Sequence, residues 1–188
     1  MTERNKFSLV DVVDEYLRLR QWVDVRVAQL EAAHRGHLAC RAGCCGCCVN
    51  LSLFTVEMIA IIGELAQAGI YTVGFDPGAS CGWLEGGMCR IYSARPIICR
   101  THGLPVAMPS EEDPQRREVS FCPLNFAGAD PVVYVFGPGN TLDLAELNER
   151  LCRVNADLLK ATRREGLELP VRVELAHLPE WLAKLGEG

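Results

Sequence analysis

The sequence predicts a single, mainly α-helical domain with an irregular cysteine-rich metal-binding centre; a small α+β fold is the alternative. Two long segments repeat apolar residues at intervals of three and four, which is the period of an amphipathic helix. Ten of the 188 residues are cysteine, and five of the ten fall within nine residues. At 49% hydrophobic, the chain has enough apolar material to build one core of its own.

We divide this single domain, residues 1–188, into three regions. An N-terminal helix occupies residues 1–39, the cysteine-cluster metal-binding region residues 40–123, and a C-terminal strand and helix extension residues 124–188. The sequence contains no internal repeat and no low-complexity linker. No second domain is therefore required.

The N-terminal region carries a long predicted helix over residues 8–33. Ser8 is suited to cap its first turn, and Gly36 is suited to stop it. The histidines His34 and His37 follow the helix, where imidazole can bind a metal, but a histidine at a helix C-terminus is more often a solvated capping residue. The apolar stripe of the helix consists of Leu9, Val13, Tyr16, Leu19, Val23, Val27 and Leu30.

Five cysteines follow in the stretch Cys40-Arg-Ala-Gly-Cys44-Cys45-Gly-Cys47-Cys48. Thiolates at this spacing can converge on one ion or cluster, and the two glycines let the backbone turn tightly enough to direct them inward. Disulfides are the alternative interpretation. Adjacent cysteines such as Cys47 and Cys48 close only a strained ring, which favours a metal centre.

A second helix is predicted from Val56 to about Ala68, capped by Thr55 and closed by Gly69. Its apolar residues cover more than one stripe, so we expect it to be buried on most sides.

The segment Pro109–Val119 is charged and carries two prolines, which predicts an exposed loop.

Four more cysteines are spread among turn residues: Cys81, Cys89, Cys99 and Cys122. The pair Gly86-Gly87 can turn the chain so that the first two of them approach each other. A lone cysteine is commonly a buried structural thiol, but four of them in turn-rich segments weaken that interpretation.

The C-terminal region begins with a short β-type run, Pro131–Phe136, followed by a helix over residues 141–164 that Thr141 is suited to cap. Cys152 lies inside that helix, and we interpret it as an ordinary buried or semi-buried thiol. The tail, residues 167–185, alternates weakly before a short helix. The apolar stripe of the long helix consists of Leu144, Leu147, Leu151, Val154 and Leu158.

Composition limits the partners. A net charge of −5 and a pI near 5.4 argue against nucleic acid, whose binders carry a basic excess. The N-terminus lacks the apolar core of a secretion signal, and no window approaches the ~18 apolar residues that span a bilayer. We therefore expect a cytoplasmic protein without a membrane partner, in which thiols stay reduced and free for metals.

The cysteines and the element Ile91-Tyr92-x-x-Arg95-Pro96 together resemble the YkgJ-type cysteine-cluster family over about residues 40–123. That family is described as a zinc- or iron-chelating domain, and many of its members are labelled iron–sulfur proteins. Cys45 and Cys152 are extra to the pattern. The ligand set that the resemblance implies is Cys40, Cys44, Cys47, Cys48, Cys81, Cys89, Cys99 and Cys122.

Eight thiolates suffice for two four-ligand sites, or for one cluster with structural extras. The adjacent thiolates of Cys47 and Cys48 are awkward ligands for one tetrahedral zinc ion, which favours an iron–sulfur cluster, with zinc as the alternative. His102 is a candidate for a further ligand or proton donor, or else a histidine bonded to backbone. The arginines near the cysteines either neutralise the sulfurs or form surface ion pairs; they are Arg41, Arg90, Arg95 and Arg100.

Three classes of function are compatible with such a centre. The first is a redox or cluster-dependent enzyme that works with a protein or redox partner. The second is a metal-handling protein without catalysis, and the third is an interaction module in which metal replaces part of the core. The sequence predicts metal binding and leaves catalysis open.

Overall fold

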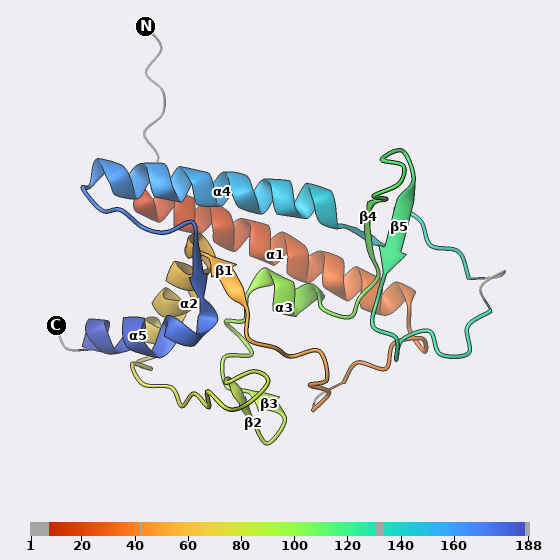
Figure 1. Ribbon diagram of the computed structural model, residues 1–188, viewed down its shortest axis with the longest axis horizontal. Coiled ribbons are helices and arrows are strands. Elements are labelled where there is room, and N and C mark those ends of the chain that lie inside the picture. The colour runs from red at the N-terminus through yellow and green to blue at the C-terminus, as the bar shows by residue number, and fades with distance from the viewer. Residues whose placement is uncertain (1–7, 42, 131–133, 187–188) are drawn as a thin grey trace, which may run out of the picture.

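Helices α1 (Leu9–Ala33) and α4 (Leu144–Arg164) lie side by side and run in opposite directions along the molecule (Figure 1). The computed structural model describes residues 8–41, 43–130 and 134–186. The predicted apolar stripes of both helices face the core, where each fully buried leucine contributes roughly 1.5–3 kcal/mol. The buried stripe residues are Tyr16, Leu19, Val23, Val27 and Leu30 of α1 and Leu147, Leu151, Val154 and Leu158 of α4.

The first turn of α1 is capped as predicted. Ser8 accepts a hydrogen bond from the amide of Asp11, whose carboxylate accepts one from the amide of Ser8 at 2.9 Å. The hydrogen bond from the Ser8 amide, followed by the one from the Ser8 hydroxyl, holds the pKa of Asp11 below its usual value. Two stripe residues predicted for this helix, Leu9 and Val13, are only partly buried, whereas Val12, which the prediction left out, is buried.

Helix α2 (Thr55–Gln67) is buried on most sides, as predicted. Its cap differs from the prediction, because Phe54 is the N-cap residue and Thr55 lies inside the helix, where its hydroxyl donates to the carbonyl of Pro170. The side chain of Glu57 accepts a hydrogen bond from the Phe54 amide at 3.2 Å. Tertiary partners thus replace the predicted threonine cap.

Two of the sheets have two strands each. Strand β1 (Ser52–Phe54) pairs antiparallel with β7 (Arg172–Glu174), which leads through the 3-10 turn Leu175–His177 into α5 (Leu178–Gly186). The predicted weak strand and short helix of the tail are confirmed, and the C-terminal region returns to the start of α2.

The second sheet is the hairpin of β2 (Leu84–Glu85) and β3 (Met88–Cys89). It turns at Gly86 and Gly87, whose φ angles of 56° and 81° lie in the left-handed region that favours glycine. The predicted glycine turn is confirmed. The short helix α3 (Ile97–Thr101) follows the hairpin.

The third sheet has the strand order β5-β4-β6, with β4 (Val106–Pro109) antiparallel to β5 (Arg117–Ser120) and parallel to β6 (Leu142–Asp143). The prediction of a loop over Pro109–Val119 was therefore wrong at both ends, because Pro109 ends β4 and residues 117–119 belong to β5. Local charge and prolines predicted a loop there, but pairing with a neighbouring strand satisfies the backbone of residues 117–120.

The predicted strand Pro131–Phe136 is not formed where the structure describes it. Its residues 131–133 lie outside the described residues, and residues 134–136 form no strand. The rings of Tyr134 and Phe136 instead pack with those of His34 and Phe126, so aromatic contacts replace strand pairing.

Two further predictions about α4 were wrong. Asp143, and not Thr141, caps the helix by accepting a hydrogen bond from the amide of Glu146 at 3.0 Å. Thr141 is buried and donates its hydroxyl to the carbonyl of Gly137 at 2.9 Å. Cys152 is exposed rather than buried, because it lies off the apolar stripe on the outer face of the helix.

The hydrophobic residues form two clusters within one α+β domain, in which helix (43%) outweighs strand (11%). The first cluster joins α1, α4, the start of α2 and Ile97 of α3. The second joins α2, β7, α5 and the segment that contains Cys81, Trp83 and Ile91. No helix among the described residues is both long enough and apolar enough to cross a bilayer.

Asn155 joins α4 to the start of α2 and to the segment that precedes β7, and it offers a test of the fold. Its side-chain oxygen accepts a hydrogen bond from the amide of Val56 at 3.0 Å, and its nitrogen donates to the carbonyl of Val171 at 3.1 Å. We expect Asn155→Ala to lower the free energy of unfolding by roughly 1–3 kcal/mol, because the buried amide of Val56 loses its partner, whereas the carbonyl of Val171 still accepts a hydrogen bond from the amide of Thr55. Chemical denaturation measures the change.

The matched control is Asn148→Ala, the same substitution at an exposed position of α4. It should leave stability unchanged or raise it slightly, since alanine is the better helix former. Equal losses in the two variants would contradict the role given to Asn155.

Candidate metal centre

The predicted ligands come from four segments that are far apart in the sequence. The loop after α1, the β2–β3 hairpin and α3 lie on one side of the α1–α4 pair (Figure 1). Cys122 follows β5 and returns to the same region, because its amide donates to the carbonyl of Gly103, just beyond α3, at 3.1 Å. All ten cysteines carry free thiols.

The cysteine loop itself consists of two successive turns. The amide of Cys44 donates to the carbonyl of Arg41 at 2.9 Å, and the amide of Cys48 donates to that of Cys45 at 3.0 Å. Gly43 lies within the first of these turns and has a φ of 84°. The sequence places glycine where the backbone needs the left-handed region.

Cys40 and Cys122 meet at Gly103. A side chain at Gly103 would place its Cβ 3.1 Å from the sulfur of Cys40 and 3.3 Å from the Cβ of Cys122. The buried amide of Asn125 holds this junction: it donates to the Gly103 carbonyl at 2.6 Å, accepts from the amide of Ala39 at 2.8 Å and lies 3.7 Å from the Cys40 sulfur. Sequence analysis missed Asn125, because a lone asparagine carries no ligand signal.

The thiols of Cys44 and Cys47 also lie near Cys40. The pKa of Cys40 is raised first by burial and then by the nearby thiols, while its hydrogen bond with Asn125 lowers it. We call this set the outer group. It consists of Cys40, Cys44, Cys47 and Cys122.

The other predicted ligands lie against the second hydrophobic cluster. Cys81 is buried in that cluster together with Trp83 and Ile91. Asn50 holds this segment to the cysteine loop, since its amide donates to the carbonyl of Ser80 at 2.8 Å and its side chain accepts from the amide of Gly82 at 3.1 Å. The hairpin then presents Cys89, and α3 presents Cys99.

The pKa shifts of these thiols agree with one neighbourhood. Burial first, and then the thiols of Cys89, Cys81 and Cys48, raise the pKa of Cys99 to about 12. Burial likewise raises the pKa of Cys48 to about 11, with Cys47, Cys81 and Cys89 among its neighbours. We call Cys48, Cys81, Cys89 and Cys99 the inner group.

Arg95 supplies positive charge to the inner group. Burial raises the pKa of Cys89, and the amide of Ile91 and the charge of Arg95 each lower it. The guanidinium lies over the ring of Tyr92 at 3.7 Å and donates to the Tyr92 carbonyl at 3.1 Å. Its Nε is buried without a hydrogen-bond partner in the described part of the chain, which leaves one donor for a bound anionic group.

The other three arginines serve differently. Arg100 forms an ion pair with Asp24 of α1 at 2.7 Å, and Arg90 forms one with Glu85 at 2.7 Å. Arg41 is exposed. Of the two roles predicted for these arginines, ion pairing therefore applies to Arg90 and Arg100.

The histidines lie at the edge of the site. His34 is buried, so the prediction of a solvated capping residue was wrong. Its Nδ1 forms a hydrogen bond with the hydroxyl of Tyr134, and its Nε2 donates to the carbonyl of Asn140 at 2.6 Å. Both ring nitrogens are thereby engaged. His37 stacks on Phe126, and His102 is exposed at the end of α3.

The donor chemistry fits a soft metal, but the ligands are not yet gathered. Among the described residues, no three Cys, His, Asp or Glu side chains already stand in a group that would hold a metal ion. Free thiols, a buried unpaired Arg95 donor and glycine-rich turns nevertheless suit a thiolate centre. Metal binding would require the loops to close.

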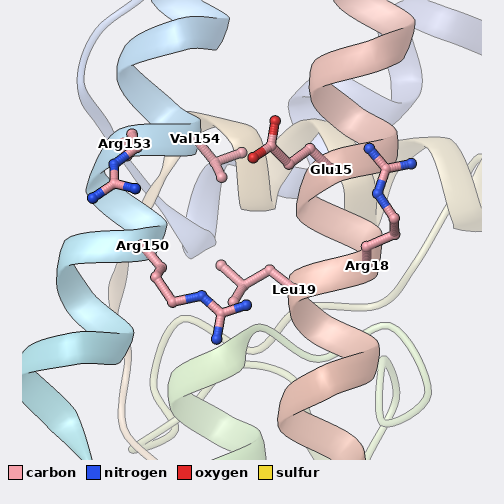
Figure 2. Close-up of a pocket in the computed structure, with 6 residues that line it drawn as sticks. All are labelled: Glu15, Arg18, Leu19, Arg150, Arg153 and Val154. Carbon is pink, nitrogen blue, oxygen red and sulfur yellow. The ribbon is translucent and has the colours of Figure 1, made fainter.

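A pocket between α1 and α4 is a separate feature, lined by residues of these two helices only (Figure 2). Two of the arginines that line it, Arg150 and Arg153, already have partners. Arg153 pairs with Glu149 at 2.8 Å, and Arg150 lies over the ring of Trp22 at 4.2 Å. The pocket thus gives no sign of a ligand site related to the cysteines.

Comparison with known proteins adds no relative: no family model matches the chain, and neither the curated proteins nor the solved structures contain a match. The resemblance to the cysteine-cluster family therefore stays a prediction.

The raised thiol pKa values predict how the metal-free protein responds to alkali. From an ordinary value of 9.0, the pKa of Cys99 rises to about 12 on folding, so the fold favours the neutral thiol. This contribution to stability is fully present below pH 9 and is lost as the pH rises towards 12. Denaturant unfolding across that range measures the loss.

The variant Cys99→Val removes the titrating group and should lose less stability over the same range. Cys152→Val, at an exposed position of α4, should lose as much as the wild type. If Cys99→Val lost as much stability as the wild type over this pH range, other groups would be the cause of the alkaline transition.

Proposed function

We propose that the protein is a thiolate metal-binding protein whose cysteines hold an iron–sulfur cluster, with zinc as the alternative occupant. The observation that carries this proposal is that the fold brings cysteines from distant segments near one another: Cys40 and Cys122, 82 positions apart, meet across Gly103, and Cys48, Cys81 and Cys89 lie at one hydrophobic cluster. Free thiols in such numbers are what soft metals bind.

The two neighbouring cysteines Cys47 and Cys48 support a cluster over a single zinc ion. Cys47 belongs to the outer group and Cys48 to the inner group, so adjacent thiolates would serve different metals. The resemblance to a family with many iron–sulfur members points the same way. A bound cluster would supply electron transfer or Lewis acidity, and the proposal assigns no reaction to it.

The roles of the protein residues follow from their positions. The cysteines would bind as thiolates, and Arg95 would offset the net charge of about −2 that a four-thiolate zinc or cluster carries. The second hydrophobic cluster, with Trp83 and Ile91 almost fully buried, would exclude water from the inner sulfurs. The thiolates, Arg95 and the second hydrophobic cluster would together hold a charged centre beside the hydrophobic core.

The first test is elemental analysis of protein purified without oxygen. We expect metal bound through thiolate in stoichiometric amount, with iron and acid-labile sulfide for a cluster or zinc for the alternative. Protein that contains neither metal, titrates ten free thiols and is stably folded would contradict the proposal.

Serine variants refine this test. Cys47→Ser removes a soft donor, so we expect it to lower the metal content and the stability together. Cys152→Ser is the matched control, because Cys152 is exposed on α4 and outside both groups. It should keep full metal occupancy.

Arg95→Met tests the charge at the inner group. We expect metal affinity to fall about ten- to hundredfold, the usual effect of losing a residue that supports ligands from the second coordination sphere. Arg90→Met is the control, since Arg90 also follows Cys89 closely but pairs with Glu85 at the surface. Competition with a metal-binding dye measures both affinities, and equal values would assign no role to Arg95.

A further inference from the structure

We propose that the eight cysteines form two separate four-thiolate centres: an inner one that keeps its metal as part of the core, and an outer one that exchanges metal with the surroundings. The inference rests on the proposed function and divides its ligands. The inner centre comprises Cys48, Cys81, Cys89 and Cys99, the first three of which lie at the second hydrophobic cluster. The outer centre comprises Cys40, Cys44, Cys47 and Cys122, of which the first and the last meet across Gly103.

Each centre has its own structural support. The outer thiols of Cys40 and Cys122 meet across Gly103 and are tied together by the buried side chain of Asn125. None of the residues in this junction belongs to the second hydrophobic cluster. That cluster instead packs against Cys48, Cys81 and Cys89 of the inner group.

The chain passes from one centre to the other at Cys47 and Cys48. The turn closed by the Cys48 amide and the Cys45 carbonyl, at 3.0 Å, ends at this pair. After it, Asn50 is fixed to Ser80 and Gly82, so the chain has already entered the inner neighbourhood. Side chains of consecutive residues can then serve two different centres.

Electrostatics favours division over one joint centre. Eight thiolates around a single ion would leave a large negative charge, whereas two four-thiolate centres carry about −2 each. Arg95 stands beside Cys89 of the inner centre, where burial makes an unbalanced charge costly. The outer centre lies nearer to water, which screens its charge.

The two groups differ in access from solvent. Cys40 and Cys44 are exposed, whereas Cys81 is buried with 8% of its surface accessible. A competing ligand must reach the metal, or a proton must reach the sulfur, before a metal–thiolate bond is exchanged. The outer centre should therefore release and take up metal while the inner centre remains loaded.

The test uses the full chain, purified without oxygen and with the metal that it carries. The protein is exposed to a chelator for increasing times, and thiols freed at each time are alkylated and identified by peptide mass spectrometry. We expect the four outer cysteines to become reactive together, with loss of half of the metal, before any inner cysteine reacts. Cys152 should react without chelator.

Simultaneous release of all eight thiols, or a first phase that mixes the two groups, would overturn the division. Both results leave the proposed function intact, since metal was bound by thiolate. A wild-type protein without metal would contradict the proposed function itself, so the two failures are distinguishable.

Double variants give an independent measurement. Cys40→Ser with Cys122→Ser should retain half of the wild-type metal and the native circular dichroism, because the inner centre and both hydrophobic clusters remain. Complete loss of metal in this variant would show one shared centre and overturn the division. Cys45→Ser with Cys152→Ser, which lies outside both groups, is the matched control and should keep all of the metal.

Discussion

The contact between α1 and α4 is the constraint on which the rest of the structure depends. Two helices with long apolar stripes bury them against each other, and α2 packs beneath the pair. The loop after α1, the β2–β3 hairpin and α3 lie on the same side of this pair as α2 (Figure 1). The cysteine loops therefore gather on one side without needing regular structure of their own.

Polar side chains buried at the joints between elements hold those loops in register. Asn155 ties α4 to the start of α2, and Asn125 ties the end of the α1 loop to the chain beyond α3. Glu57 does the same for α3, since its carboxylate accepts a hydrogen bond from the amide of Ile97 at 3.1 Å. Each of these side chains forms hydrogen bonds with segments far from it in the sequence. Removing such a side chain would leave buried groups unpaired.

Burial and metal binding act on the thiols in opposite directions. Apolar surroundings raise the pKa of Cys99 and Cys48 and favour the neutral form, whereas a soft metal requires thiolate. A metal would thus release protons as it binds and would draw together loops that packing alone leaves apart. In the proposed function, folding of the central region and metal uptake are therefore coupled.

Local pattern was enough to predict the long helices, the capping by Ser8 and the glycine turn at Gly86 and Gly87, because each depends on neighbours within a few residues. The candidate ligand set came from the resemblance to the cysteine-cluster family and stays a prediction. Thr55 and Thr141 were predicted wrongly as caps, since their hydroxyls instead bond carbonyls brought near by the fold.

Only the tertiary structure decided which cysteines are neighbours. In sequence, Cys47 and Cys48 are adjacent and Cys40 and Cys122 are distant, yet the fold joins Cys40 to Cys122 across Gly103 and places Cys48 beside Cys81. It also decided that Cys152 is exposed and that His34 is buried. Spacing along a chain specifies which residues are able to bind metal, whereas long-range packing and hydrogen bonds determine which of them meet.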